Sequence, residues 1–283
     1  MRVDTLSDNS VNSLSIKKKE LILKIIVYIV SSILVLITMY PFILLFVEFT
    51  GFSTKDPANM FKVLGTRGKE IVEFFKSDGL KAMINTLIIS FSSTILNVYF
   101  AALTAHGINA YKWKFRKIFS NFVLILMMIP TVVASAGFVQ LAYKFHLNNK
   151  LILFILPAIA TPVSVVFMRL YLESSFPMEL LYSARIDGAG EFRIFNQIVL
   201  PILKPAIATQ AIFGFASSWN DAGLPRILLT DKEKFTLPIA IMMGRASGNA
   251  TIVILVSTVP LLVVFLILSR YIVEGVELGG VKM

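Results

Sequence analysis

Long runs without charged side chains constrain this chain more than any other feature. A helix needs roughly 20 predominantly apolar residues to cross the hydrocarbon of a bilayer. Runs of that length, or close to it, cover residues 25–47, 82–105, 118–143, 151–168, 205–220 and 246–269. Hydrophobic residues make up 56% of the chain and charged residues 16%, a balance more apolar than that of water-soluble domains. The sequence therefore predicts an all-α polytopic membrane protein with about six transmembrane helices.

The fifth run is the shortest, and its second half holds Gly214, Ser217 and Ser218. Transporters place discontinuous helices with such breaks around their solute paths. We therefore expect this span to be broken or to line a pathway.

Basic residues predict the orientation of the spans, because cytoplasmic loops carry an excess of lysine and arginine. Lysines cluster before the first run, and four basic residues lie between the second and third runs at positions 112–117. We expect residues 1–24 to form a cytoplasmic segment and residues 25–283 to form the transmembrane domain, with both termini inside. The loop at residues 51–80 then lies outside although it also holds basic residues, and its apolar spacing predicts an amphipathic helix.

Composition argues against most catalytic chemistry. The chain has no cysteine and two histidines, which leaves no thiol nucleophile and little for an imidazole metal centre. The stretch GTRGK at residues 65–69 has two residues between its glycines where a phosphate-binding loop has four, and Glu70 stands where Ser or Thr would bind magnesium. The net charge of +10 fits basic loops at lipid head groups better than nucleic-acid binding. We expect a protein that is not an enzyme and binds no cofactor itself.

A charged segment at residues 173–204 separates the fourth and fifth runs and is far longer than most connections. Pro177 suits the first turn of a helix, and Asp187-Gly188 predicts a break between two helical stretches. Leu200-Pro201 marks the expected end of the second stretch. Physical chemistry alone leaves two interpretations open, namely a docking element for another subunit and an amphipathic hairpin lying on the membrane.

Several spaced motifs resemble a known family. The charged segment holds Ala184, Asp187-Gly188-Ala189, Phe195, Ile198, Leu200-Pro201 and Lys204-Pro205-Ala206. The other motifs are Asn85-Thr86-Leu87, FASSWND at residues 215–221, TLPIA at residues 236–240 and the tail IVEGVELGGVK. Together they are similar to permease subunits of bacterial ABC importers, in particular the second, maltose-type permease of the carbohydrate-uptake subfamily. The charged segment resembles the EAA loop of that family.

The resemblance implies a type I ABC importer permease fold in the bacterial inner membrane. It also implies four kinds of partner: a second homologous permease, two ATPase subunits that bind ATP and magnesium, an extracytoplasmic solute-binding protein, and membrane lipid. The expected solute is a sugar or oligosaccharide, and a permease for another solute is an alternative. A secondary transporter is a further alternative, but it would need an inverted repeat or a buried coupling residue, and neither is evident in the sequence.

In this family the EAA loop forms coupling helices that dock in a cleft on the ATPase. Carried onto this sequence, the coupling residues are Glu179, Tyr182, Ser183, Ala184, Arg185, Asp187, Gly188, Ala189 and Phe195. Tyr182-Ser183-Ala184 stands where the family usually has Glu-Ala-Ala, and Tyr182 offers packing and one hydroxyl hydrogen bond in place of an ion pair. The resemblance also implies that the tail at residues 271–283 reaches the ATPase subunits in the closed state.

Polar and aromatic residues in the spans predict the solute path. Those able to hydrogen-bond sugar hydroxyls or stack on sugar rings are Asn97, Ser164, Phe213, Ser217, Ser218, Trp219 and Asn220. Small polar side chains also hold helices together, so helix packing is an alternative for each polar residue. No ionisable group lies deep in a run, which favours an uncharged solute over proton-driven transport.

Overall fold

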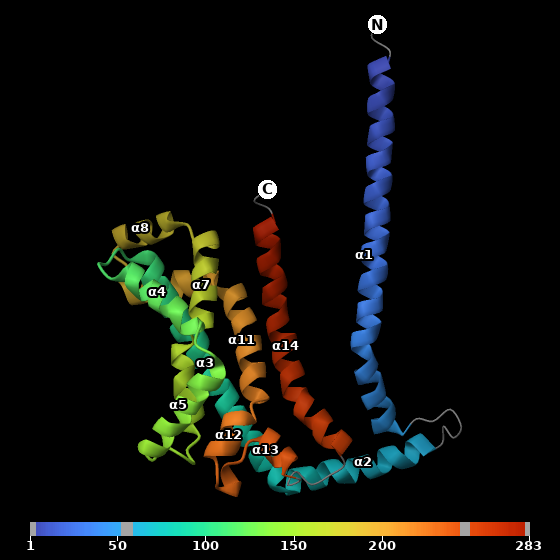
Figure 1. Cartoon of the computed structure of the whole chain (residues 1–283), viewed down its shortest axis with the longest axis vertical. Coiled ribbons are helices and arrows are strands. Elements are labelled where there is room, and N and C mark those ends of the chain that lie inside the picture. The colour runs from blue at the N-terminus through green and yellow to red at the C-terminus, as the bar shows by residue number, and fades with distance from the viewer. Residues whose placement is uncertain (1–3, 52–58, 244–249, 281–283) are drawn as a thin grey trace. The chain divides into compact units, whose positions relative to one another are not determined.

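The computed structural model of the protein describes residues 4–51, 59–243 and 250–280, with side chains described for residues 19–51, 63–243 and 252–272. Every regular element in these ranges is a helix (Figure 1). The chain divides into two compact units, Met1–Lys69 and Glu70–Met283. Four helical segments are long and apolar enough to cross a membrane, and two bent helix pairs raise the number to six if each pair is one span.

The first unit contains α1 (Asp4–Thr50) and the start of α2 (Asn59–Lys76). The predicted first span lies inside α1, where the part from Lys19 to Thr50 is long and apolar enough to cross a membrane. The buried Arg67 of α2 donates hydrogen bonds to the carbonyls of Glu48 and Phe49, at 3.2 and 3.3 Å. The GTRGK stretch lies within α2, so its backbone N–H groups are not arranged as a phosphate-binding loop.

The second unit is built around α3 (Asp78–Ala110), which packs against α7 (Pro162–Ser175) and α11 (Lys204–Trp219). The helix α14 (Ala250–Gly280) packs on the other side of α11. Small buried residues on α3, among them Ala101, Ala102 and Ala105, let neighbouring helices approach closely. Four predicted spans are thus helices of one bundle.

The predicted fourth span comprises α6 (Ile152–Ile155), the 3₁₀ helix η1 (Leu156–Ala160) and α7. It continues to Ser175 rather than ending at residue 168. Arg169 and Glu173 pair one helical turn apart at 2.8 Å, and this mutual pairing allows the helix to extend beyond the apolar run.

The predicted third span is not one straight helix. It consists of α4 (Arg116–Met127) and α5 (Thr131–Lys144), whose axes meet at 97°. Pro130 lies at the break, where it lacks an N–H donor and holds φ near −59°. The predicted span over residues 118–143 is thus a bent pair of helices in the structure.

The charged segment is helical on both sides of a turn, as predicted. It comprises α8 (Met178–Ile186), α9 (Glu191–Ile194), the π-helix η2 (Phe195–Val199) and α10 (Leu200–Ile202). The second stretch does not end at Leu200-Pro201 but runs to Ile202, and a bend of 78° at Leu203 separates it from α11. Pro201 has no N–H to bond the preceding turn, and the π-helix just before it accommodates that loss.

The opposite end of the bundle carries α12 (Gly223–Leu228), η3 (Lys232–Lys234) and α13 (Leu237–Met242), as Figure 1 shows for α12 and α13. Here Asn85 Nδ2 donates to the carbonyls of Glu233 and Phe235 at 2.8 and 3.1 Å. The backbone N–H of Leu237 donates to Thr86 Oγ1 at 2.7 Å. Two sequence motifs that lie about 150 residues apart are therefore in direct contact.

Candidate functional site

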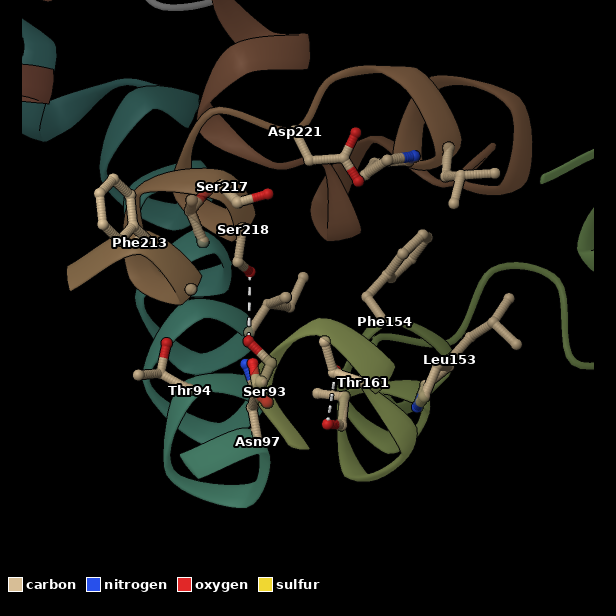
Figure 2. Close-up of a pocket in the computed structure, with 18 of the residues that line it drawn as sticks. Ser93, Thr94, Asn97, Leu153, Phe154, Thr161, Phe213, Ser217, Ser218 and Asp221 are labelled. Atoms are coloured by element: carbon tan, nitrogen blue, oxygen red, sulfur yellow. Dashed lines mark hydrogen bonds between the residues drawn. The ribbon is translucent and has the colours of Figure 1, made fainter. Parts of the chain in front are cut away.

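A cavity of about 620 Å³ lies between α3, α11 and the residues around η1. Figure 2 shows polar side chains at the cavity from α3 (Ser93, Thr94 and Asn97), from α11 (Ser217 and Ser218) and from Asp221, which follows α11. Burial raises the pKa of the Asp221 carboxyl. Leu153, Phe154 and Thr161 contribute from the fourth span on the facing side. The cavity is large enough for a small organic molecule and is formed by residues from five separate stretches of sequence.

Two pairs of side chains in the cavity satisfy each other. Ser93 Oγ donates to Ser218 Oγ at 3.2 Å, and Ser164 Oγ donates to Gln210 Oε1 at 3.0 Å. Both bonds join helices across the cavity wall, so these side chains hold the wall together while exposing their remaining hydrogen-bonding capacity.

Three other polar side chains that line the cavity have a buried atom without a partner among the described residues: Thr94 Oγ1, Asn97 Oδ1 and Thr236 Oγ1. Each residue is less than 9% exposed. A buried polar atom that stays unpaired costs about 1–3 kcal/mol, so such atoms normally find a partner. These three atoms expose almost no surface to the cavity in this structure, so a solute hydroxyl or a water molecule can pair with them only after their side chains rotate.

The structure brings five of the seven predicted path residues to this cavity, namely Asn97, Ser164, Phe213, Ser217 and Ser218. Their contact with a solute stays a prediction. Trp219 and Asn220 do not line it. The indole of Trp219 is buried against α14, with Nε1 donating to the Ser257 carbonyl at 2.9 Å, and Asn220 Nδ2 donates to the Ala216 carbonyl.

Helical periodicity explains why Trp219 and Asn220 miss the cavity. They follow Ser217 and Ser218 by two residues, and residues two apart on a helix do not share a face. The sequence reasoning missed Thr94, Asp221 and Thr236, which also line the cavity. Thr94 was recoverable because it lies three residues before Asn97 on the same helix face, whereas Thr236 reaches the cavity only through the contact between α13 and α3.

The second candidate site is the turn between α8 and α9. Gly188 has φ of +79°, a left-handed conformation that glycine adopts without steric cost. The turn is closed by backbone hydrogen bonds from Gly188 N–H to the Arg185 carbonyl at 3.1 Å and from Ala189 N–H to the Ala184 carbonyl at 3.0 Å. No atom lies within 4 Å of the position that a Cβ on Gly188 would occupy, so the turn projects into open space.

An ion pair and an aromatic ring fix this turn to the end of α3. Arg185 Nε lies 2.7 Å from Glu191 Oε1, and the Tyr111 hydroxyl donates to Glu191 Oε2 at 2.5 Å. The Arg185 guanidinium also lies over the Tyr111 ring, 5.4 Å from its centroid. We call Tyr111, Arg185 and Glu191 the turn clamp. Arg185, one of the predicted coupling residues, is thus engaged within the chain by Glu191 and Tyr111.

The turn clamp shifts the titration of its members. Hydrogen bonds from Arg185 and then from Tyr111 hold the pKa of Glu191 below its ordinary value. Burial, followed by the bond to Glu191, raises the pKa of Tyr111. A carboxylate with a depressed pKa contributes its stabilisation above its unfolded pKa and loses it only as the pH falls through the lower folded value. The clamp is therefore intact at neutral pH and under mild acidity.

The predicted coupling residues fall into two groups in the structure. Glu179, Tyr182, Ser183, Asp187 and Gly188 are exposed, and Ala189 is partly exposed. Ala184 and Phe195 are instead buried in the core, where Phe195 packs against Tyr99 and His106 of α3. These two residues anchor the loop to the core, because the apolar faces of α8 and η2 pack against α3 and α7.

Two exposed apolar side chains flank the turn and were not foreseen. Ile186 is 86% exposed and Phe192 is 74% exposed. Neither residue lies on the buried face of its helix, which is formed by Leu181 and Ala184 on α8 and by Ile194 and Phe195 in the next stretch. An apolar residue off the buried face was the signal in the sequence that could have identified both. Together with Gly188 they make an apolar projection at the tip of the loop.

Comparison with known proteins now bears on these two sites. Residues 97–277 match the family of binding-protein-dependent transport system inner membrane components. The chain belongs to this family. The match includes both the cavity residues of α11 and the whole turn between α8 and α9. The chain is therefore a membrane-embedded permease component of a binding-protein-dependent importer, a transport subunit rather than an enzyme.

Individual relatives agree with the family. The arabinooligosaccharides transport system permease protein AraQ of Bacillus subtilis is 35% identical over 207 residues, which is 71% of this chain and 73% of the relative. The maltodextrin transport system permease protein MdxG of the same organism is 32% identical over 208 residues, or 70% of this chain and 74% of the relative. The melibiose/raffinose/stachyose import permease protein MelC of B. subtilis is 31% identical over 208 residues, or 71% and 75%.

Solved structures share the fold. A bacterial ABC transporter involved in the import of the acidic polysaccharide alginate matches with a TM-score of 0.57 at 19% identity, over 68% of this chain and 74% of that one. The methionine ABC transporter MetNI matches with a TM-score of 0.52 at 15% identity, over 69% and 95%. The predicted type I ABC importer permease fold is confirmed. The predicted contact of the tail rests on residues 281–283 in part, and these lie outside the described residues.

Proposed function

We propose that the permease moves a sugar or oligosaccharide and forms half of its translocation path. Three relatives that are 31–35% identical over about 70% of this chain are named for oligosaccharide or maltodextrin transport. The cavity supports the proposal chemically, because a space of about 620 Å³ is lined by polar side chains that include the accessible residues Ser217 and Ser218. Sugar hydroxyls both donate and accept hydrogen bonds and can pair with the hydroxyl groups of these serines.

We propose a complete importer of one second permease, two ATPase subunits and one extracytoplasmic solute-binding protein. In this proposal ATP and magnesium bind to the ATPase subunits and this chain binds neither. The GTRGK stretch supports that division, since it is helical and has Glu70 at the position where a hydroxyl would hold magnesium. Copurification tests the assembly. Retention of an ATPase subunit in detergent agrees with it, and solute uptake by the chain alone would contradict it.

We propose that the turn at Gly188 is the contact through which the ATPase subunits drive the spans. The support is geometric. A rigid left-handed turn with open space around it carries two exposed apolar side chains, and its own helices are packed on α3 and α7. A displacement of the tip is therefore transmitted to the helices that form the cavity.

Uptake into proteoliposomes that contain the assembled importer tests the solute class. Labelled maltodextrin, raffinose and arabinooligosaccharide are offered with the solute-binding protein and ATP, and methionine serves as the control solute. We expect ATP-dependent accumulation of at least one saccharide and none of methionine. Accumulation of methionine without any saccharide would assign the permease to another solute.

The orientation is a further part of the proposal. Basic residues at positions 112–117 favour the cytoplasmic side for that loop, which places the turn of residues 145–150 outside. The natural chain has no cysteine, so one introduced at Asn148 reports accessibility without background. We expect labelling from the outside of intact cells by a membrane-impermeant reagent. Labelling only from the cytoplasmic side would reverse the assignment.

A further inference from the structure

An apolar groove of about 340 Å³ opens at the junction between α3 and α4, away from the solute cavity. Its lining residues are Thr104, Gly107, Ile108, Tyr111, Trp113 and Phe119. No atom lies within 4 Å of the position that a Cβ on Gly107 would occupy, so there is free space beside this residue in the groove. None of the six residues carries a formal charge, and only Thr104 and Tyr111 have a hydroxyl group, so the groove suits a hydrocarbon chain rather than a solute rich in hydroxyls.

Basic residues flank the lining residues of this groove in the sequence, since Lys112 and Lys114 stand on either side of Trp113. Lys112, Lys114, Arg116 and Lys117 all belong to the short connection between α3 and α4 or to the first turn of α4. None of the four forms an ion pair with a residue in the described part of the chain. Lys112, Lys114 and Lys117 are exposed and Arg116 is partly exposed, so all four can reach a ligand.

The neighbouring face of α4 is that of a helix in contact with lipid. Ile118, Phe122 and Ile125 follow one another at helical spacing and are 65%, 52% and 58% exposed. Trp113 is 41% exposed at the same end, the position where indole rings sit at a membrane interface. The groove thus begins at the interface and continues toward the hydrocarbon.

We propose that this groove binds an anionic phospholipid. One acyl chain lies along Ile108, Trp113 and Phe119, and the head group pairs with the four basic residues. An anionic head group complements four adjacent cations, whereas a zwitterionic head group gains little from them. The proposal depends neither on the solute of the importer nor on its coupling mechanism.

The position of the groove gives the lipid a route to the turn clamp. Tyr111 is one of the lining residues of the groove, and its hydroxyl donates to Glu191 Oε2. The Arg185 guanidinium lies 5.4 Å from the centroid of the Tyr111 ring. A lipid that packs on Tyr111 therefore contacts the residue that fixes the turn to α3.

Fluorescence of Trp113 tests the site directly, because the chain has two tryptophans and Trp113 lines the groove. The full chain carrying Trp219→Phe is reconstituted in bilayers with either brominated phosphatidylglycerol or brominated phosphatidylcholine at equal mole fraction. We expect the brominated phosphatidylglycerol to quench about twofold more strongly. Substitution of Lys112, Lys114, Arg116 and Lys117 by Gln should abolish the difference. The control replaces Lys144, Lys150, Arg226 and Lys232 by Gln, which removes the same charge elsewhere and should leave the difference intact.

Equal quenching by the two lipids would overturn the proposal, as would a difference that survives loss of the four basic residues. Absence of quenching by either lipid in the assembled importer would show that another subunit covers the groove, and this also overturns it. If Trp219→Phe fails to fold, the natural chain is compared with the Trp113→Phe variant. The natural chain should then show stronger quenching by the brominated phosphatidylglycerol. The variant should show no preference, because its remaining Trp219 is buried against α14.

Discussion

Arg185 and Glu191 form an ion pair at 2.7 Å that bridges the two helices flanking Gly188. The Tyr111 hydroxyl donates to the other carboxylate oxygen and joins the pair to the end of α3. The turn at Gly188 is therefore fixed by residues of the permease itself, and its tip is exposed.

Glu191→Gln removes the charge that both partners bind. Arg185 and Glu191 are partly exposed, and pairs of this kind contribute about 0.2–1 kcal/mol, so the protein should remain folded. We expect hydrogen exchange at the amides of residues 187–189 to become about two- to fivefold faster. Glu233→Gln, which breaks the pair with Lys81 at the opposite end of the bundle, is the control. Unchanged exchange in the Glu191 variant would show that the clamp does not hold the turn.

Ile186 and Phe192 should bind a partner surface, because both are large, apolar and almost fully exposed beside the turn. We expect replacement of both by Ser to reduce retention of the ATPase subunits by about tenfold in detergent, the loss that corresponds to about 1.4 kcal/mol. The thermal stability of the permease should change little. Ile227→Ser, at an exposed position of α12, is the control. Full retention of the ATPase would remove these residues from the interface.

Gly214 of α11 lines the cavity and lies against Asn97 of α3. A Cβ at this position would lie 3.3 Å from Asn97 Nδ2 and 3.9 Å from Thr94 Oγ1. We expect Gly214→Val to displace the Asn97 side chain and to lower saccharide uptake by about tenfold, the loss that follows when a buried polar group is mispaired. Gly137→Val is the matched control, since no atom lies within 4 Å of that Cβ position. Equal uptake by the two variants would show that the cavity is not part of the solute path.

Trp219→Phe separates helix packing from solute binding. The substitution removes the hydrogen bond from Nε1 to the Ser257 carbonyl but keeps an aromatic ring beside Phe215. We expect a loss of about 1 kcal/mol in stability and no change in the preference among saccharides. Melting temperature and competition between two saccharides measure the two effects. A changed preference between the two saccharides with an unchanged melting temperature would show that Trp219 contacts the solute.

The sequence predicted most of the helices because charge-free runs report directly on burial in lipid. It failed where a local break depends on backbone geometry, as at Pro130, which divides the third span. The amphipathic helix α2 and the turn at Gly188 were predictable from local spacing alone. The π-helix before Pro201 was not, since it depends on how Phe195 and Val199 pack in the core.

The cavity was predictable only in part. Asn97, Ser217 and Ser218 were identified as polar residues within apolar runs, a signal that does not distinguish a wall of a cavity from a helix contact. Thr236 joins the cavity through long-range packing, with Leu237 N–H bonded to Thr86 Oγ1 across 151 positions of sequence. Likewise, the engagement of Arg185 by Glu191 and Tyr111 depends on tertiary placement of α3.

Gly188→Trp tests the coupling role most directly. The Cβ position of Gly188 meets open space, so a side chain can start there without a clash within this chain, and an indole adds bulk where a docked subunit would lie. The positive φ adds strain for any side chain, and Gly188→Asn, which tolerates that conformation, controls for it. The decisive measurement is ATP-driven saccharide uptake by the assembled importer in proteoliposomes. We expect Gly188→Asn to retain uptake and Gly188→Trp to lose it together with the ATPase stimulation by the solute-binding protein, whereas normal uptake by Gly188→Trp would contradict the coupling role of this turn.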